Sequence, residues 1–170
     1  MKKNGFTLIE LLVVIVIIGI LAGIGISSFK NYKLKAQTAK VTAETKPLLD
    51  ALIIARTLNE SPLRYVTNHT SSGWSGCVSI DLRNIPDGSV CMNNWNNARN
   101  KISQISGIGL SAFKRDPWGS PYLLDENEGE AAGNYCRRDL LQSAGPNGVA
   151  YDDDDIEINI PFYDFKQCGI

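Results

Sequence analysis

The sequence contains a single histidine, His69, and no pair of cysteines in a C-x-x-C arrangement. Zinc centres are built mostly from cysteine and histidine at such spacings, so a zinc site is not expected. The segment Gly73–Gly76 reads G-W-S-G and lacks the G-x-S-x-G pattern of a nucleophile elbow. A phosphate-binding glycine motif is also missing. These absences argue against an enzyme.

An excess of charge of one sign is missing as well, because the formal net charge is -1 at pH 7. The densest basic pairs, Lys114-Arg115 and Arg137-Arg138, are isolated from one another along the chain. A nucleic-acid-binding protein normally gathers its basic residues into a patch. Direct nucleic-acid binding is therefore not expected.

The N-terminus carries an unbroken apolar run from Leu11 to Ile26. With its flanks, residues 6–28 form a helix of roughly 34 Å, which is enough to cross a bilayer. Gly5 precedes the apolar run, so cleavage after Gly5 would leave this helix in the mature chain. Lys2 and Lys3 would hold the leader on the cytoplasmic side.

Glu10 is the one acidic residue in this apolar stretch. An ionised carboxylate near the end of a membrane segment usually has a partner. After cleavage, that partner would be the new amine of Phe6, in the same chain or in a neighbouring copy. Solvation of Glu10 at the headgroup level is an equally good reading of this residue alone.

The segment Gly5–Leu12, with the sequence G-F-T-L-I-E-L-L, resembles the leader junction of type IV pilins and type II secretion pseudopilins. The resemblance implies cleavage after Gly5 by a prepilin peptidase and N-methylation of Phe6. It also implies that Glu10 pairs with the N-terminal amine of a neighbouring subunit, because burying both charges together is tolerable whereas burying one is not. Ser27 departs from the family pattern, in which many members have a proline.

The rest of the chain predicts an α+β fold, in which a long N-terminal transmembrane and amphipathic helix packs on a small antiparallel sheet, as in type IV pilins. We expect a leader at 1–5, a transmembrane and assembly helix at 6–28, an amphipathic half-helix at 29–60 and a globular head at 61–170. The helix should end near Leu58. Its apolar stripe comprises Leu34, Val41, Leu48, Leu52 and Ala55.

Alternating or apolar runs in the head predict strands at 78–82, 122–124, 135–141 and 156–160, and residues 93–105 predict a short helix. The turn at Pro86–Gly88 suggests a hairpin that joins the first strand to residues 89–91.

The four cysteines are Cys77, Cys91, Cys136 and Cys168. An even number beside an export-like N-terminus favours two disulfides. Of the three possible pairings we prefer Cys77–Cys91 and Cys136–Cys168, because each joins neighbours along the chain. Four buried free thiols are the alternative.

Two head segments resemble the major pseudopilin of type II secretion in particular. Residues 116–122 (D-P-W-G-S-P-Y) are close to its D-P-W-G-N-P-Y signature, and residues 143–156 resemble its S-x-G-x-D-G…D-D-I loop, which binds calcium in those relatives. Calcium prefers six to eight oxygen ligands. The predicted ligand set is Ala144 (carbonyl), Asn147, Asp153, Asp154 and Asp155, with Asn147 replacing the usual aspartate. A solvated acidic turn without a metal is the alternative.

These features predict a structural subunit of a type IV pilus-like filament, either a type II secretion pseudopilus or a type IV pilus. Its partners would be further copies, a prepilin peptidase, the inner-membrane assembly platform and the membrane. It would reside in the inner membrane before assembly and then in a filament in the periplasm or at the cell surface. The alternatives are a DNA-uptake or surface-adhesion pilin whose head binds a ligand, and an anchored monomer.

Overall fold

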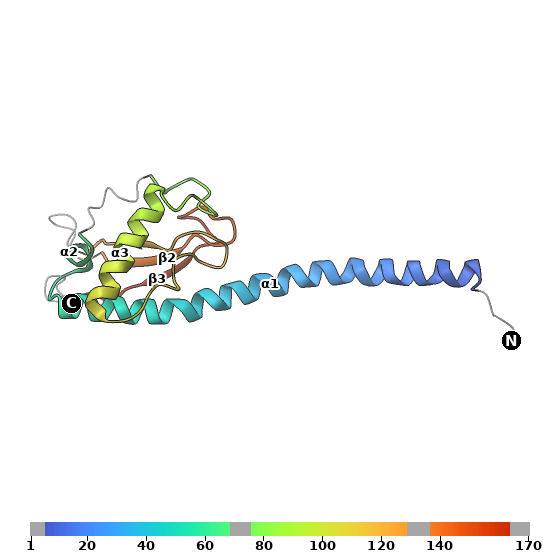
Figure 1. Ribbon diagram of the computed structural model, residues 1–170, viewed down its shortest axis with the longest axis horizontal. Coiled ribbons are helices and arrows are strands. Elements are labelled where there is room, and N and C mark those ends of the chain that lie inside the picture. Colours follow the sequence, from blue (N-terminus) through green and yellow to red (C-terminus); the bar gives the residue numbers. More distant parts are fainter. Residues whose placement is uncertain (1–5, 69–75, 129–136, 164–170) are drawn as a thin grey trace. The chain divides into compact units, whose positions relative to one another are not determined.

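A computed structural model describes residues 6–68, 76–128 and 137–163 (Figure 1). The chain forms two compact units, Met1–Ala36 and Gln37–Ile170. Helix α1 (Leu8–Leu58) ends at the predicted residue and contributes to both units. The apolar side chains of α1 between residues 8 and 21 are exposed. Within the described residues, no helix combines the length and the apolar character that crossing a membrane requires.

The second unit contains the C-terminal part of α1, the helices α2 and α3 and a sheet, which confirms the predicted α+β fold (Figure 1). Its elements are α2 (Leu63–Thr67), α3 (Val90–Ser106), β1 (Leu123–Asp125), β2 (Leu140–Ser143) and β3 (Ile156–Asn159). The strands form an antiparallel sheet in the order β1-β2-β3. In its register Leu123 lies opposite Gln142, and Gln142 lies opposite Glu157.

The core of this unit forms where α1 and α3 meet the sheet. Four residues of the predicted apolar stripe are fully buried there: Val41, Leu48, Leu52 and Ala55. The fifth, Leu34, lies in the first unit and is exposed, so the buried stripe begins later in the helix. Trp95 of α3 is buried against this core, and its indole N–H donates to the carbonyl of Phe113.

The segment 116–122 fastens the loops of the head onto α1. Gln37 donates to the carbonyl of Pro117 at 2.9 Å, and the Tyr122 hydroxyl donates to Glu44 at 2.5 Å. Asp116 closes the turn by accepting from the backbone N–H groups of Trp118 and Ser120. The segment therefore has a structural role.

The predicted hairpin at 78–91 is wrong. Residues 78–82 form no strand, and Ser79 has a positive φ of 62°. Residues 90 and 91 instead open α3, whose first turn is capped by the Ser89 hydroxyl accepting from the N–H of Met92. Cys77 and Cys91 are joined by a disulfide, which ties the irregular segment to a helix rather than to a second strand.

The strand predicted at 135–141 is displaced, because the observed strand β2 begins only at Leu140. Residues 135 and 136 lie outside the described residues, and so do Gly5, His69 and Cys168. The predicted Cys136–Cys168 pairing therefore remains a prediction.

A buried carboxyl lies where β2 begins. Asp139 is 1% exposed and accepts from the N–H of Glu128 at 2.8 Å, and its own carbonyl accepts from the N–H of Ile160. The pKa of Asp139 is raised to about 7, mainly by burial and also by the nearby carboxylates of Glu128 and Glu126, while the hydrogen bond from the Glu128 N–H and the charge of Arg56 oppose the rise. Asp139 therefore keeps its proton in the folded chain under mildly acidic conditions.

This raised pKa makes the stability of the fold depend on pH. The unfolded carboxyl ionises near 3.8, so between about pH 4 and pH 7 the folded chain keeps a proton that the unfolded chain has lost. The Asp139 contribution to the free energy of unfolding is then present below this window and lost as pH rises through it, by on the order of 4 kcal/mol. Asp139→Asn should raise the neutral-pH stability and flatten this dependence in urea denaturation series. The exposed Asp50→Asn is the control, and equal pH profiles for Asp139→Asn and wild type would contradict the assignment.

Candidate metal centre and assembly terminus

The start of α1 is fixed by a reciprocal pair of hydrogen bonds between Thr7 and Glu10. The Glu10 carboxylate accepts from the backbone N–H of Thr7 at 2.8 Å and from its hydroxyl at 2.7 Å. In return, the Thr7 hydroxyl oxygen accepts from the N–H of Glu10 at 3.3 Å. This is a capping box, so the helix begins two residues after Phe6, which is exposed. Glu10 thus has a local structural partner within a single chain.

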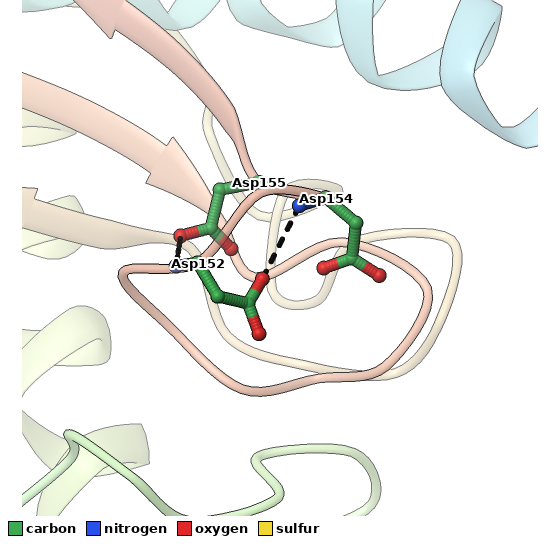
Figure 2. A group of neighbouring side chains, drawn as sticks. All are labelled: Asp152, Asp154 and Asp155. Carbon is green, nitrogen blue, oxygen red and sulfur yellow. Dashed lines mark hydrogen bonds between the residues drawn. The ribbon is translucent and has the colours of Figure 1, made fainter.

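The loop between β2 and β3 brings three carboxylates together. Asp152, Asp154 and Asp155 each place an oxygen within 4.8 Å of the others (Figure 2). Asp155 accepts from the N–H of Asp152 at 3.0 Å, and Asp152 accepts from the N–H of Asp154 at 3.2 Å. The loop backbone therefore holds the acids in place despite their mutual repulsion.

This arrangement disfavours the ionised form of the two acids nearest β3. Partial burial raises the pKa values of Asp154 and Asp155, and neighbouring acids add to both shifts. In contrast, the hydrogen bond from the Asn147 amide lowers the pKa of Asp152. Carboxylates of raised pKa that lie close together are relieved by a cation, so the loop can hold a metal ion.

Buried oxygens without hydrogen-bond partners occur in the acidic loop and in the strand β2 beside it. Asp154 Oδ1, Asp155 Oδ1 and Gln142 Oε1 are buried, and none has a hydrogen-bond partner among the described residues. Buried polar atoms are normally paired, so each of these oxygens needs a donor or a cation. The donor set consists of hard oxygens, the type that calcium prefers.

A glycine and an arginine shape this loop. Gly145 has a φ of +60°, and a Cβ there would lie 2.3 Å from the carbonyl oxygen of Asp154. Arg83, which pairs with Asp81, donates to the carbonyl of Pro146 at 2.9 Å. The N–H of Leu82 donates to the carbonyl of Gly148 at 2.8 Å. The disulfide-closed segment 77–91 thus braces the acidic loop.

The structure brings some of the predicted calcium ligands together and leaves others outside the cluster. Asp154 and Asp155 belong to the cluster, whereas Asp153 lies outside it. The carbonyl of Ala144 accepts from the N–H of Gly148, and Asn147 Oδ1 accepts from the N–H of Val149 at 2.6 Å. These two oxygens therefore already serve the turn.

Sequence reasoning omitted two residues of this region, Asp152 and Gln142. Asp152 belongs to the acidic run, but the spacing alone did not say which of the four acids converge. Gln142 carries no motif signal, because only the pairing of β2 with its neighbours places it beside the loop.

The two head segments that resemble pseudopilin signatures are joined directly. Ser143, the first residue of the acidic-loop motif, donates its hydroxyl proton to Asp116 at 2.6 Å. Asp116 is buried, which raises its pKa. One hydrogen bond therefore links the D-P-W-G-S-P-Y segment to the loop.

One of the basic pairs considered for nucleic-acid binding is engaged within the head. Lys114 and Arg115 both bind the carboxylate of Asp87, at 2.6 and 2.9 Å. Arg138 stacks over the ring of Phe162, with its guanidinium carbon 5.2 Å from the ring centroid. These contacts are made within the second unit.

Comparisons with known proteins cover most of the chain. A family model described as the prokaryotic N-terminal methylation motif matches residues 1–26. Type II secretion system core protein G of Klebsiella pneumoniae is 31% identical over 160 residues, covering 91% of this chain and 93% of that protein. The chain belongs to the type II secretion system core protein G family. The Escherichia coli (strain K12) core protein G is 36% identical over 155 residues, covering 91% of this chain and 90% of that protein.

Similarity to pilins is more limited. The type IV major alpha-pilin of Moraxella bovis is 36% identical over 84 residues, covering 49% of this chain and 53% of that protein. No solved structure matches the chain significantly. Membership of the core protein G family makes the chain a major pseudopilin, a structural subunit of a pilin-like filament and not an enzyme.

The geometry at Gly145 predicts that no other residue fits there. Gly145→Ala combines a left-handed backbone with a contact to the Asp154 carbonyl, and should lower the free energy of unfolding by about 1–3 kcal/mol. Thermal and urea denaturation of the full chain measure this loss. Gly109→Ala is the matched control, since a Cβ there meets nothing within 4 Å. Equal stability of the two variants would rule out the tight loop described above.

Proposed function

We propose that the chain is the major subunit of a type II secretion pseudopilus, cut after Gly5, N-methylated at Phe6 and held in the filament through Glu10. The observation that carries the choice of pseudopilus over pilus is coverage. The similarity to core protein G extends over 91% of the chain, whereas the similarity to the Moraxella pilin covers 49%. A match over 91% of the chain must include most of the head, and this supports a subunit of the secretion type.

Processing would expose a positive charge next to the capping box. Cleavage after Gly5 makes the backbone nitrogen of Phe6 an amine, one residue before Thr7. Glu10 already accepts two hydrogen bonds from Thr7. In the filament, the same carboxylate pairs with the amine of an adjoining copy, so that neither charge is buried alone.

The proposed path of the subunit follows from this terminus. Residues 6–28 anchor the precursor in the cytoplasmic membrane, where a prepilin peptidase removes residues 1–5 and an assembly platform adds the subunit to the filament. The head then lies outside the cytoplasm. Support comes from the match of residues 1–26 to the methylation motif and from the apolar composition of the segment. An oxidising compartment also suits the disulfide between Cys77 and Cys91.

The role of Glu10 predicts the outcome of two substitutions. Glu10→Ala should abolish filament formation in cells that also carry a type II secretion assembly system, because the partner amine would be buried without a counter-charge. Asp50→Ala, which removes an exposed acid from the same helix, should assemble like wild type. Sheared filaments are quantified by immunoblot and electron microscopy.

Mass spectrometry of the mature chain provides the accompanying check. The mature chain should lack residues 1–5 and carry one added methyl group at Phe6. Normal filaments from Glu10→Ala would sink the assembly role, and an uncut chain in those cells would sink the processing step.

We further propose that the acidic loop binds calcium, with Asp152, Asp154 and Asp155 holding the ion. The buried, unpaired oxygens Asp154 Oδ1 and Asp155 Oδ1 support this assignment. The bound ion would neutralise the acids and fix the loop against the segment 77–91. The family resemblance adds three further candidate ligands, Ala144, Asn147 and Asp153.

Calcium should therefore raise the melting temperature of the full chain in detergent, and Asp154→Ala combined with Asp155→Ala should abolish the rise. Differential scanning fluorimetry with calcium and with a chelator measures it. Asp153→Ala separates the two ligand sets: the rise persists if only the clustered acids bind the ion. Identical melting curves for wild type with calcium and with chelator would refute the site.

A further inference from the structure

Gln142 is a buried amide beside the acidic loop. It lies in β2, is 1% exposed, and faces Leu123 and Glu157 in the neighbouring strands. A glutamine is seldom buried so completely unless its amide is paired. Here only half of the amide is paired: Nε2 donates to Asp155 Oδ2, whereas Oε1 is buried without a partner among the described residues.

The hydrogen bond from Gln142 is one of three that converge on a single oxygen of Asp155. Asp155 Oδ2 also accepts from the backbone N–H groups of Tyr151, at 2.5 Å, and Asp152, at 3.0 Å. The other oxygen, Oδ1, accepts none and is buried. The carboxylate is thereby held in one orientation, with one oxygen saturated and the other left for a ligand.

Gln142 Oε1, like Asp154 Oδ1 and Asp155 Oδ1, is buried without a hydrogen-bond partner among the described residues. An amide oxygen can only accept, so a buried Oε1 requires a donor. No described side chain or backbone group supplies one. A hydrated calcium ion brings water molecules whose O–H groups are donors, and it coordinates neutral and charged oxygens alike.

We propose that Gln142 is a positioning residue of the calcium site, which orients Asp155 through Nε2 and gains a donor for Oε1 when the hydrated ion binds. This inference rests on the proposed calcium binding of the acidic loop. Gln142 does not replace a carboxylate, since it acts through Asp155 and carries no charge.

The test compares Gln142→Met with wild type, as full-length chain in detergent, by isothermal titration with calcium chloride. Methionine fills a similar volume but can neither donate nor accept strongly. We expect calcium to bind at least about tenfold more weakly, whereas the chelator-treated melting temperature stays equal or rises because a buried unpaired oxygen is gone. Gln104→Met, at an exposed position of α3, is the matched control and should bind calcium like wild type.

A double-variant cycle shows whether Gln142 acts through Asp155. Gln142→Met should weaken calcium binding less in an Asp155→Asn background than in wild type, because the orientation of that carboxylate no longer matters. Gln142→Leu repeats the measurement should the methionine variant fold poorly.

The outcomes separate this inference from the proposal beneath it. If wild type binds calcium and Gln142→Met binds it equally well, Gln142 has no positioning role although the site stands. If Gln142→Met melts lower in chelator with unchanged calcium affinity, its role is purely structural and the inference is overturned. If wild type shows no calcium heat or melting shift, the metal site itself fails.

Discussion

Carboxylates withdrawn from water must find hydrogen-bond donors, and this constraint organises the head of the protein. The sheet has three short strands and cannot fix the long connections around it. Buried acids do so instead. The Asp116 carboxylate accepts hydrogen bonds from the N–H groups of Trp118 and Ser120 in its own turn. It also accepts one from the hydroxyl of Ser143, at the start of the acidic loop. Because a buried acid costs free energy unless donors are in place, these hydrogen bonds hold the loops in one arrangement.

The same constraint couples parts of the head that are far apart in sequence. The disulfide closes residues 77–91, and this segment donates to the acidic loop through Leu82 and Arg83. It also reaches the D-P-W-G-S-P-Y turn, where the N–H of Asn84 donates to the carbonyl of Gly119. A change in the conformation of the acidic loop therefore alters the hydrogen bonds of the disulfide-closed segment 77–91. An ion that neutralised the loop would stabilise more than its own ligands.

Asp155 and Glu10 differ in how many donors of their own chain hold the carboxylate. Asp155 in the head is surrounded by donors from its own chain, so its position is set before any ligand arrives. Within residues 6–68, 76–128 and 137–163, the hydrogen bonds of the Glu10 carboxylate are those of the capping box with Thr7. A residue with so few internal partners is suited to exchange them on assembly, whereas a residue with many is suited to a fixed site. Filament subunits need both properties, since the terminus must join copies and the head must keep its shape.

The sequence by itself determined the N-terminal half and the fold class. The apolar run, Gly5 and Glu10 are local signals, and the helix to Leu58 follows from helical periodicity, because such patterns depend on near neighbours in the chain. The segment 78–82 shows the limit: its alternation predicted a strand, but the disulfide to Cys91 joins it to a helix capped by Ser89.

Only the tertiary structure decided which acids converge and which buried amide meets them. A run of four aspartates does not reveal that Asp152 joins the carboxylate cluster while Asp153 does not, since the direction of each side chain depends on the φ and ψ angles of the turn. Gln142 is an ordinary polar residue in the sequence. Strand pairing places it next to Asp155, thirteen residues away, because contacts between strands are set by register and not by local composition.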